Sequence, residues 1–180
     1  MMLILSFVLI IVLTVIDQII KFIAVKNISV GQVIELIKIG DKNILDLTHI
    51  RNTGAAWSIM QGKTWFLIVL PIAVLIGGII FMTVKRNSLK KLEVISISMI
   101  IAGGIGNLID RIRLREVVDY ISFKFIDFPV FNFADICVVI GEILLLAYIF
   151  FFETDKEKEK KTAKAEEADS KQTEKAQADE

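Results

Sequence analysis

Four long apolar runs divide the chain, and polar segments separate them. The runs cover residues 1 to about 25, 65–84, 92–109 and 133–152. A helix needs about 20 residues to cross a hydrocarbon core about 30 Å thick. The pattern therefore predicts four transmembrane helices, and a mean hydropathy of +0.64 is typical of a membrane protein. The first run has no basic segment before it and no small-residue cleavage site after it, so we expect a retained helix and no signal peptide.

Basic residues predict the orientation of these helices in the membrane. The loop at 85–91 reads "KRNSLKK", with four basic residues in seven. Loops that are rich in Lys and Arg stay on the cytoplasmic side. Because the number of spans is even, both termini are then cytoplasmic, and residues 26–64 and 110–132 face outward.

The first outer segment alternates between apolar and polar residues. At 33–50, "VIELIKI" and "ILDLTHI" flank the turn "GDKN". Two alternating runs around Gly, Asp and Asn are typical of a β-hairpin. The predicted fold is therefore an all-α membrane protein with four transmembrane helices and a small extracytoplasmic β-hairpin or cradle at about 26–64.

The formal net charge of zero hides a difference between two parts of the chain. Residues 1–152 hold 14 Lys and Arg against 11 Asp and Glu, a balance of +3, whereas residues 153–180 hold 7 against 10, a balance of −3. The second part has almost no apolar residues and cannot form a core. We expect a transmembrane domain at 1–152 and a charged, disordered cytoplasmic tail at 153–180. No basic face suggests nucleic acid as a partner.

Cys137 is the only cysteine of the chain, and His49 is the only histidine. An internal disulfide is therefore impossible, and no Cys/His cluster has the spacing of a zinc site. We expect no metal and no cofactor. For His49 we expect a structural or surface role.

Ionisable residues in membrane spans are costly, and they usually face the protein interior and mark function. Here such residues gather near one membrane surface, although four separate segments supply them. Asp17 and Lys21 are four residues apart and can pair on one helix face. The glycines in "GGIGN" allow neighbouring helices to approach closely beside the polar residues that follow. The other members of the set are Asn107, Asp110, Arg111, Asp119, Asn132 and Asp135.

A structural explanation stays open for part of this set. Asn132 and Asp135 have the spacing of a capping box, although Glu is the usual acid there. Arg111 could reach the membrane interface from a helix end. A cap that fixes the Asp135 side chain is also compatible with catalysis by the same carboxylate.

Asp119 and Asp135 can act together if they lie close to each other. Two neighbouring carboxylates cannot both ionise readily, so they share one proton. The ionised group can take a proton from water, and the protonated group can donate to a peptide. This is the chemistry of aspartic proteases. The single histidine argues against a Ser/His/Asp triad.

Five motifs in order make the chain resemble the lipoprotein signal peptidases, or signal peptidase II. They are "DQIIK" at 17–21, "RNTGAAW" at 51–57, "GGIGNLIDR" at 103–111, "VVDY" at 117–120 and "FNFAD" at 131–135. The resemblance covers nearly all of residues 1–152. It implies a bacterial membrane aspartic endopeptidase that removes signal peptides from prolipoproteins and cuts before a cysteine that carries diacylglycerol.

The resemblance also implies roles for single residues. Asp119 and Asp135 match the catalytic pair, and Asp17 and Lys21 match a structural polar pair. Substrate-binding or supporting positions are matched by Asn52, Gly54, Asn107, Asp110, Arg111 and Asn132. The expected partners are diacylglyceryl-modified prolipoproteins and membrane lipids. We expect a monomer in the bacterial cytoplasmic membrane, with its active site near the outer face.

Some features depart from the family pattern. Tyr120 and Trp57 stand where Phe is usual, and the tail is longer than the family requires. Glu142 follows Asp135 by seven residues, which predicts the same side of the fourth helix about 10 Å deeper. We assign Glu142 no role.

Two other functions stay open. In a small transporter or proton-conducting protein, intramembrane acids form a relay, but only Glu142 lies at middle depth. In a non-catalytic scaffold, caps and packing explain every polar residue. A protease of the presenilin type needs Gly-x-Gly-Asp, which "GGIGNLID" does not supply.

Overall fold

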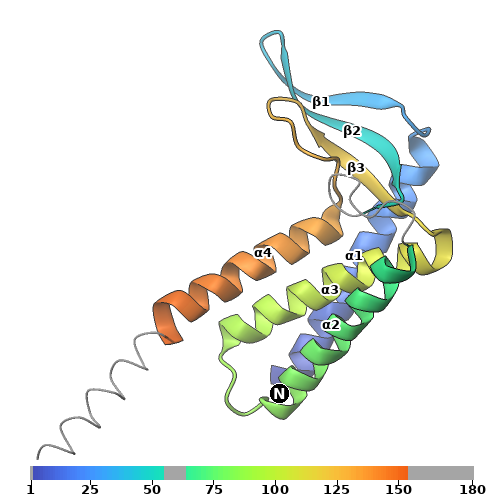
Figure 1. The fold of residues 1–180 in the computed structure, drawn as a ribbon. Helices are drawn as coiled ribbons and strands as arrows, with labels where there is room; N and C mark the ends of the chain where they lie inside the picture. Colours follow the sequence, from blue (N-terminus) through green and yellow to red (C-terminus); the bar gives the residue numbers. More distant parts are fainter. Residues whose placement is uncertain (1, 55–63, 154–180) are drawn as a thin grey trace, which may run out of the picture.

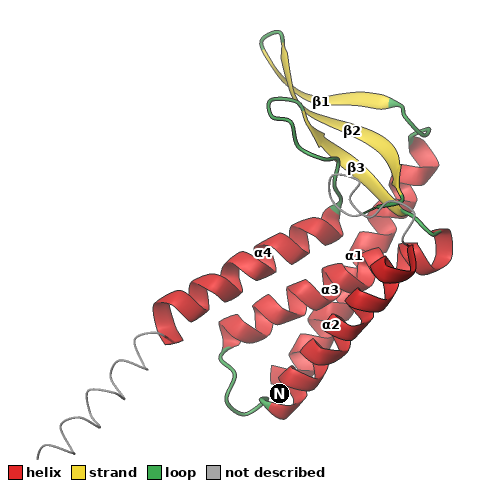
Figure 2. Ribbon diagram, viewed as in Figure 1, coloured by secondary structure: helices red, strands yellow, loops and turns green. Residues whose placement is uncertain are grey.

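The computed structural model describes residues 2–54 and 64–153. Its long helices form a bundle, and a small sheet stands at one end of this bundle (Figure 1, Figure 2). The helices are α1 Met2–Asn27, α2 Thr64–Val84, α3 Lys91–Leu114 and α4 Phe133–Tyr148, and α4 continues as the π-helical turn η2 Ile149–Glu153. Trp57 and residues 154–180 of the charged tail lie outside the described residues.

The four helices are long and apolar enough to cross a membrane, with the fourth counted through Phe151. Many of their large apolar side chains are exposed, such as Phe22 at 66% and Leu146 at 65%. Soluble monomers rarely expose so much apolar surface, whereas a bilayer covers it with lipid. The predicted all-α membrane fold is confirmed.

Helix α3 lies at the centre of the bundle and contacts α1, α2 and α4. Glycines allow two of these contacts. A Cβ atom at Gly103 would collide with the carbonyl oxygen of Ala134 in α4, and one at Gly106 would collide with the carboxylate of Asp17 in α1. The predicted close packing around the glycine motif is confirmed.

The sheet has three antiparallel strands in the order β1, β2, β3, which span Val33–Ile39, Lys42–Asn52 and Val117–Phe123. Strands β1 and β2 form the predicted hairpin, and Gly40 in its turn has a φ of +60°. Strand β3 is not apparent from the sequence, because it follows directly on a helix end and is buried on both faces, so its residues do not alternate between apolar and polar. It pairs Asp119 with Ile50 of β2 and so completes the cradle from outside the 26–64 segment.

Helix α3 is longer than the apolar run that predicts it. The run ends at residue 109, but the helix continues to Leu114. Arg115 ends the helix in the left-handed region with a φ of 65°, and its N–H donates to the carbonyl oxygen of Arg111. Arg and Leu are good helix formers whether they are exposed or buried. Asp110 and Arg111 therefore lie inside the helix and not at its end.

His49 and Glu142 are isolated polar residues that differ in burial. His49 is buried in β2, and its ring Nδ1 lies 2.9 Å from the carbonyl oxygen of Ile28, so it has the predicted structural role. Glu142 lies on the exposed surface of α4 beside the exposed Ile143. The expectation that ionisable residues of the spans face the protein interior is wrong for Glu142, because α4 packs through a different face that includes Cys137.

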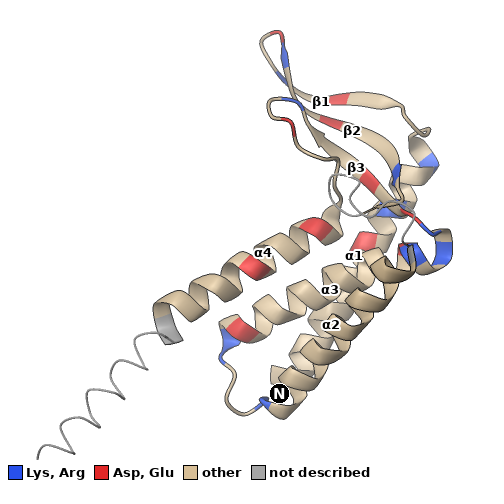
Figure 3. Ribbon diagram, viewed as in Figure 1, with Lys and Arg blue, Asp and Glu red and all other residues tan. Residues whose placement is uncertain are grey.

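The two ends of the bundle differ in charge and content. The basic residues between α2 and α3 lie at the end opposite the sheet (Figure 3), and the N-terminus of α1 lies at that same end (Figure 1). The sheet end contains the end of α3, strand β3 and the start of α4. These elements supply most of the candidate site residues.

Candidate active site

A buried cluster of charges joins α1 to α3. The Nζ atom of Lys21 lies 3.0 Å from Asp17 Oδ2 and 2.9 Å from Asp110 Oδ2, and it donates to Asn107 Oδ1 at 2.9 Å. The three charged side chains are at most 5% exposed. A charge that leaves water needs partners of opposite sign and further hydrogen bonds. Here one ammonium group serves two carboxylates.

The same carboxylates hold two other elements in place. Asp17 Oδ1 accepts a hydrogen bond of 3.0 Å from the N–H of Ala134, in the first turn of α4. Asp110 Oδ2 accepts one of 3.2 Å from the N–H of Val118 in β3. The first N–H groups of a helix have no partner within the helix, so Asp17 supplies one. The cluster therefore positions the strand and the helix that carry the two candidate catalytic aspartates.

Asn132 is fully buried and links these two aspartates. Its Nδ2 donates to Asp119 Oδ1 at 2.7 Å and to Asn107 Oδ1 at 3.0 Å. Its Oδ1 accepts from the N–H of Asp135 at 3.0 Å, and its own N–H donates to Asp135 Oδ2 at 3.1 Å. The last two bonds form the capping box that the sequence predicts.

The capping box does not occupy the whole carboxylate of Asp135. Its Oδ1 accepts a hydrogen bond of 2.7 Å from Asn107 Nδ2. Asn107 Oδ1 in turn accepts from Lys21. Asp135 is only partly buried. The cap therefore accounts for the position of the Asp135 side chain and for the contact of Oδ2, but not for the hydrogen bond that Oδ1 accepts.

Asp119 is 3% exposed and lies in β3, outside the membrane spans. Its Oδ2 accepts a hydrogen bond of 3.0 Å from Asn52 Nδ2. Burial raises the pKa of Asp119 to about 7, and the charge of Asp135 adds to this shift, while the amides of Asn52 and Asn132 oppose it. Close to neutral pH, this carboxyl can therefore hold a proton and donate it.

Asn52 and Arg111 hold the chain where it leaves β2. Asn52 Oδ1 accepts from the N–H of Gly54 at 2.9 Å, and Arg111 Nη2 donates to the carbonyl oxygen of Gly54 at 3.2 Å. The charge of Arg111 also acts on Asp119 and Asp135. The structure thus brings all the predicted site residues to the sheet end of the bundle.

Two residues without a predicted role belong to the same network. Gln18 Nε2 lies 3.2 Å from each of Asp17 Oδ2, Asp110 Oδ1 and the carbonyl oxygen of Gly106. The hydroxyl oxygen of Tyr120 accepts a hydrogen bond of 3.1 Å from the N–H of Phe133. Each residue has a signal in the sequence that could have indicated its role. Gln18 is an amide inside an apolar run, and Tyr120 directly follows Asp119.

The arrangement is suited to proton transfer. Two carboxyl groups from different elements lie in one network of amide donors, and one of them can carry a proton near pH 7. Within residues 2–54 and 64–153, no three His, Cys, Asp or Glu side chains are grouped as ligands for a metal ion.

Most of the chain matches a known protein family. A family model described as signal peptidase (SPase) II matches residues 9–151. The chain belongs to the signal peptidase II family. The match includes the whole described sheet, helices α2 to α4 and every residue of the candidate site.

Named relatives of this signal peptidase II chain agree. It is 41% identical over 137 residues to a lipoprotein signal peptidase of Enterococcus faecalis. This alignment covers 76% of this chain and 82% of the relative. It is 43% identical over 136 residues to a lipoprotein signal peptidase of Listeria monocytogenes serotype 4a. This second alignment covers 74% of this chain and 85% of the relative.

A solved structure shows the same fold. A bacterial membrane enzyme, determined by the in meso method at 2.3 Å resolution, aligns with a TM-score of 0.75 and 33% identity. The alignment covers 84% of this chain and 90% of that chain. This member of the signal peptidase II family is therefore a bacterial multi-pass membrane protease.

Proposed function

We propose that this protein is an aspartic endopeptidase that removes signal peptides from bacterial prolipoproteins. It cuts before the cysteine that carries diacylglycerol, and Asp119 and Asp135 activate the attacking water. One observation carries the proposal: Asn132 bonds to both carboxyl groups, which come from a strand and a helix distant in sequence. The family assignment supplies the substrate class.

The reaction begins with the shared proton on Asp119, in keeping with its raised pKa of about 7. Asp135 takes a proton from water while the water oxygen attacks the scissile carbonyl carbon, and Asp119 gives its proton to the carbonyl oxygen. The resulting diol then collapses. Its C–N bond breaks, the amine leaves with the proton from Asp135, and one diol hydroxyl returns a proton to Asp119. The pair ends in its starting state.

The neighbours of the pair have supporting roles in this proposal. Asn52 and Asn132 donate to Asp119 and fix the orientation of its carboxyl group. Asn107 does the same for Asp135. The ion cluster around Lys21 positions the elements beneath them, and Arg111 with Gly54 meets the substrate where the chain leaves β2.

For the orientation, we propose that both termini are cytoplasmic and that the active site lies near the outer face. The basic loop at the end opposite the sheet supports this orientation (Figure 3), because Lys-rich and Arg-rich loops stay inside. A single chain supplies every residue of the network, so a monomer suffices for catalysis. A proton relay is not favoured, since Glu142 is exposed on α4 and does not face the site.

The direct test is cleavage of a defined lipopeptide. The purified protein is incubated with a diacylglyceryl-modified prolipoprotein peptide and with the same peptide without lipid, and the products are identified by mass. We expect a single cut before the modified cysteine and no cut in the unmodified peptide. Equal cleavage of both peptides, or cleavage of neither by folded protein, contradicts the proposal.

A further inference from the structure

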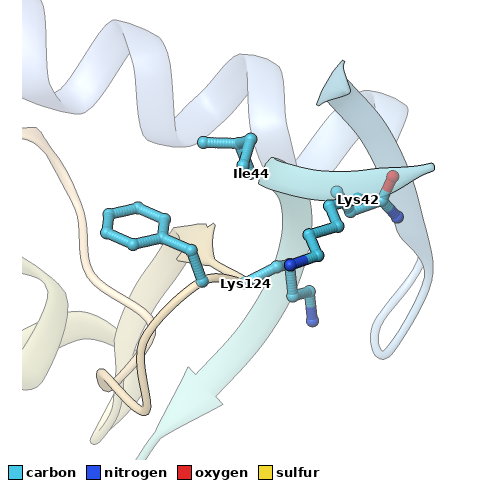
Figure 4. Close-up of a pocket in the computed structure, with 5 residues that line it drawn as sticks. Lys42, Ile44 and Lys124 are labelled. Carbon is cyan, nitrogen blue, oxygen red and sulfur yellow. The ribbon is translucent and has the colours of Figure 1, made fainter. Parts of the chain in front are cut away.

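A pocket of about 300 Å³ lies at the far end of the sheet from the candidate active site. It is lined by Lys42, Asn43, Ile44, Lys124 and Phe125. Figure 4 shows that β2 and the chain after β3 supply these side chains. Lys42 and Asn52 are the two ends of β2, so along the strand the pocket is about 30 Å from the residues that contact Asp119. The pocket is therefore separate from the catalytic network.

Two cationic side chains reach this pocket. Lys124 Nζ forms an ion pair of 3.6 Å with the buried Asp46 Oδ2, and the Lys124 side chain is 41% exposed, so it can also contact a ligand. Within the described part of the chain, Lys42 forms no salt bridge. Asp41 and Asp127 are close in sequence but do not line the pocket. With Asp46 facing Lys124 and no acid among the described residues paired with Lys42, the lining carries a net positive charge, which favours an anionic ligand.

Apolar side chains continue from the pocket over the neighbouring loop. Phe125 is 58% exposed, Ile126 48% and Phe128 47%. Phe123 supports them, because its ring centroid lies 5.4 Å from that of Phe125 and 6.1 Å from that of Phe128. Exposed aromatic rings beside lysines are typical of the membrane interface, where the rings meet lipid and the ammonium groups reach the polar layer.

We propose that this pocket binds the phosphodiester headgroup of an anionic phospholipid from the surrounding bilayer. The phosphate accepts hydrogen bonds from Lys42 and Lys124, and the glycerol backbone and first acyl carbons lie along Ile44 and Phe125. A volume of about 300 Å³ equals that of about ten water molecules, which is enough for a phosphate with its glycerol group. The bound lipid holds the far end of the sheet at the membrane surface, and this role does not depend on the proposed peptidase chemistry.

The test uses phosphatidylglycerol as the probe. The full-length protein is titrated with it in phosphatidylcholine nanodiscs, and native mass spectrometry measures the retained lipid. The double variant Lys42→Gln/Lys124→Gln removes both pocket charges. The matched control Lys26→Gln/Lys38→Gln removes two lysines at the same end of the molecule that do not line the pocket.

The two variants should differ clearly. A lysine that contacts the phosphate contributes roughly a fivefold factor to lipid affinity, so the pocket variant should lose about 20-fold or more. The control should stay within about twofold of the unaltered protein, because Lys26 and Lys38 do not line the pocket. Both variants should cleave the lipopeptide at the rate of the unaltered protein. An equal loss in both variants, or no loss in the pocket variant, overturns the proposal.

Two further measurements identify the ligand and guard against a folding defect. Inorganic phosphate at millimolar concentration should not displace the lipid, and displacement overturns the assignment to a bilayer lipid. If the double lysine variant does not fold, Phe125→Trp in a Trp57→Phe/Trp65→Phe background keeps both lysines. Brominated phosphatidylglycerol should then quench its fluorescence more strongly than brominated phosphatidylcholine, and equal quenching overturns the proposal.

Discussion

Asn132 and Asp135 bond each other twice: the N–H of Asp135 donates to Asn132 Oδ1 at 3.0 Å, and the N–H of Asn132 donates to Asp135 Oδ2 at 3.1 Å. This reciprocal cap leaves the other oxygen of Asp135 to accept from Asn107. A cap needs only an oxygen at this position, whereas catalysis needs an acid. One substitution can therefore separate the two roles.

Asp135→Asn keeps a side-chain oxygen for the cap and removes the acid. The lost charge near a helix N-terminus costs about 0.3–1 kcal/mol of stability. The new NH2 group also faces Asn107 Nδ2, which loses its acceptor at a cost of about 1–3 kcal/mol. Cleavage should fall below about one part in a hundred, because general acid–base catalysis alone contributes about 10²–10⁴-fold. Asp119→Asn should lose cleavage to the same extent, and its stability cost comes from the lost acceptor of Asn52 or Asn132. The measurements are cleavage rate and thermal unfolding in detergent.

The double variant Asp119→Asn/Asp135→Asn should cleave scarcely more slowly than either single variant. Residues that act as one unit give losses that do not add. Losses that multiply would indicate independent roles. Full activity in either single variant, with normal insertion, would leave Asp135 as a cap alone.

The activity should depend on pH through Asp119, whose pKa is raised to about 7. The proposed mechanism needs its protonated form. Below about pH 7 the cleavage rate should stay nearly constant, and above it the rate should fall about tenfold for each pH unit. Single-turnover cleavage between about pH 5.5 and 8.5 measures this profile. A rate that rises through this range contradicts the assignment of Asp119 as the proton donor.

The stability should depend on pH in a related way. The folded pKa of Asp119 lies above its ordinary value of 3.8, so the folded state binds this proton more tightly. The stabilisation is complete below about pH 4 and is lost as pH rises toward about 7. Asp119→Asn should remove this part of the slope in thermal unfolding. An unchanged slope in the variant would assign the pH dependence to other groups.

Gly106→Ala should damage the site from beneath. The added Cβ would lie 2.5 Å from Asp17 Oδ2 and 3.2 Å from the Cβ of Ala134. Overpacking of this kind costs about 1–3 kcal/mol, and the displaced Asp17 loses its hold on the start of α4. The control is Gly77→Ala, where nothing lies within 4 Å of the new atom. The control should be neutral or more stable by up to about 1 kcal/mol. Equal unfolding temperatures for Gly106→Ala and Gly77→Ala would therefore contradict the packing argument.

Tyr120→Phe removes only the hydroxyl oxygen that accepts from the N–H of Phe133. A hydrogen bond of this kind contributes about 0.5–1.5 kcal/mol. Because the bond positions the first turn of α4, kcat should fall several-fold with little change in KM. Tyr120→Leu, which also removes the ring, should lose more stability. If Tyr120→Phe matches the unaltered protein in both kcat and unfolding temperature, the hydroxyl has no positioning role.

Cysteine labelling can test the proposed topology in a Cys137→Ala background. A cysteine in place of Asp41, in the exposed hairpin turn, should react with an impermeant reagent in spheroplasts. A cysteine in place of Ser88, in the exposed loop between α2 and α3, should react only after lysis. The reverse pattern would place the aspartates on the cytoplasmic side.

The local pattern of residues determines the four spans, the β1–β2 hairpin and the cap on α4. Each depends on contacts between residues close in sequence: about 20 apolar residues for a span, a turn with Gly40 for the hairpin, and a spacing of three for Asn132 and Asp135. The motifs around Asp119 and Asp135 also indicate the family, because five of them occur in the expected order. These conclusions need no knowledge of how the helices pack.

Only the tertiary structure determines the third strand, the exposure of Glu142 and the contacts of the site. Asn52 and Asp119 are 67 positions apart in sequence, and Asp17 and Ala134 are 117 apart, yet each pair is joined by a hydrogen bond. Periodicity shows which face of an element is apolar, but it does not show which other element covers that face. The packing of α3 against α1 and α4, and the pairing of β3 with β2, bring these residues together, and that burial raises the pKa of Asp119.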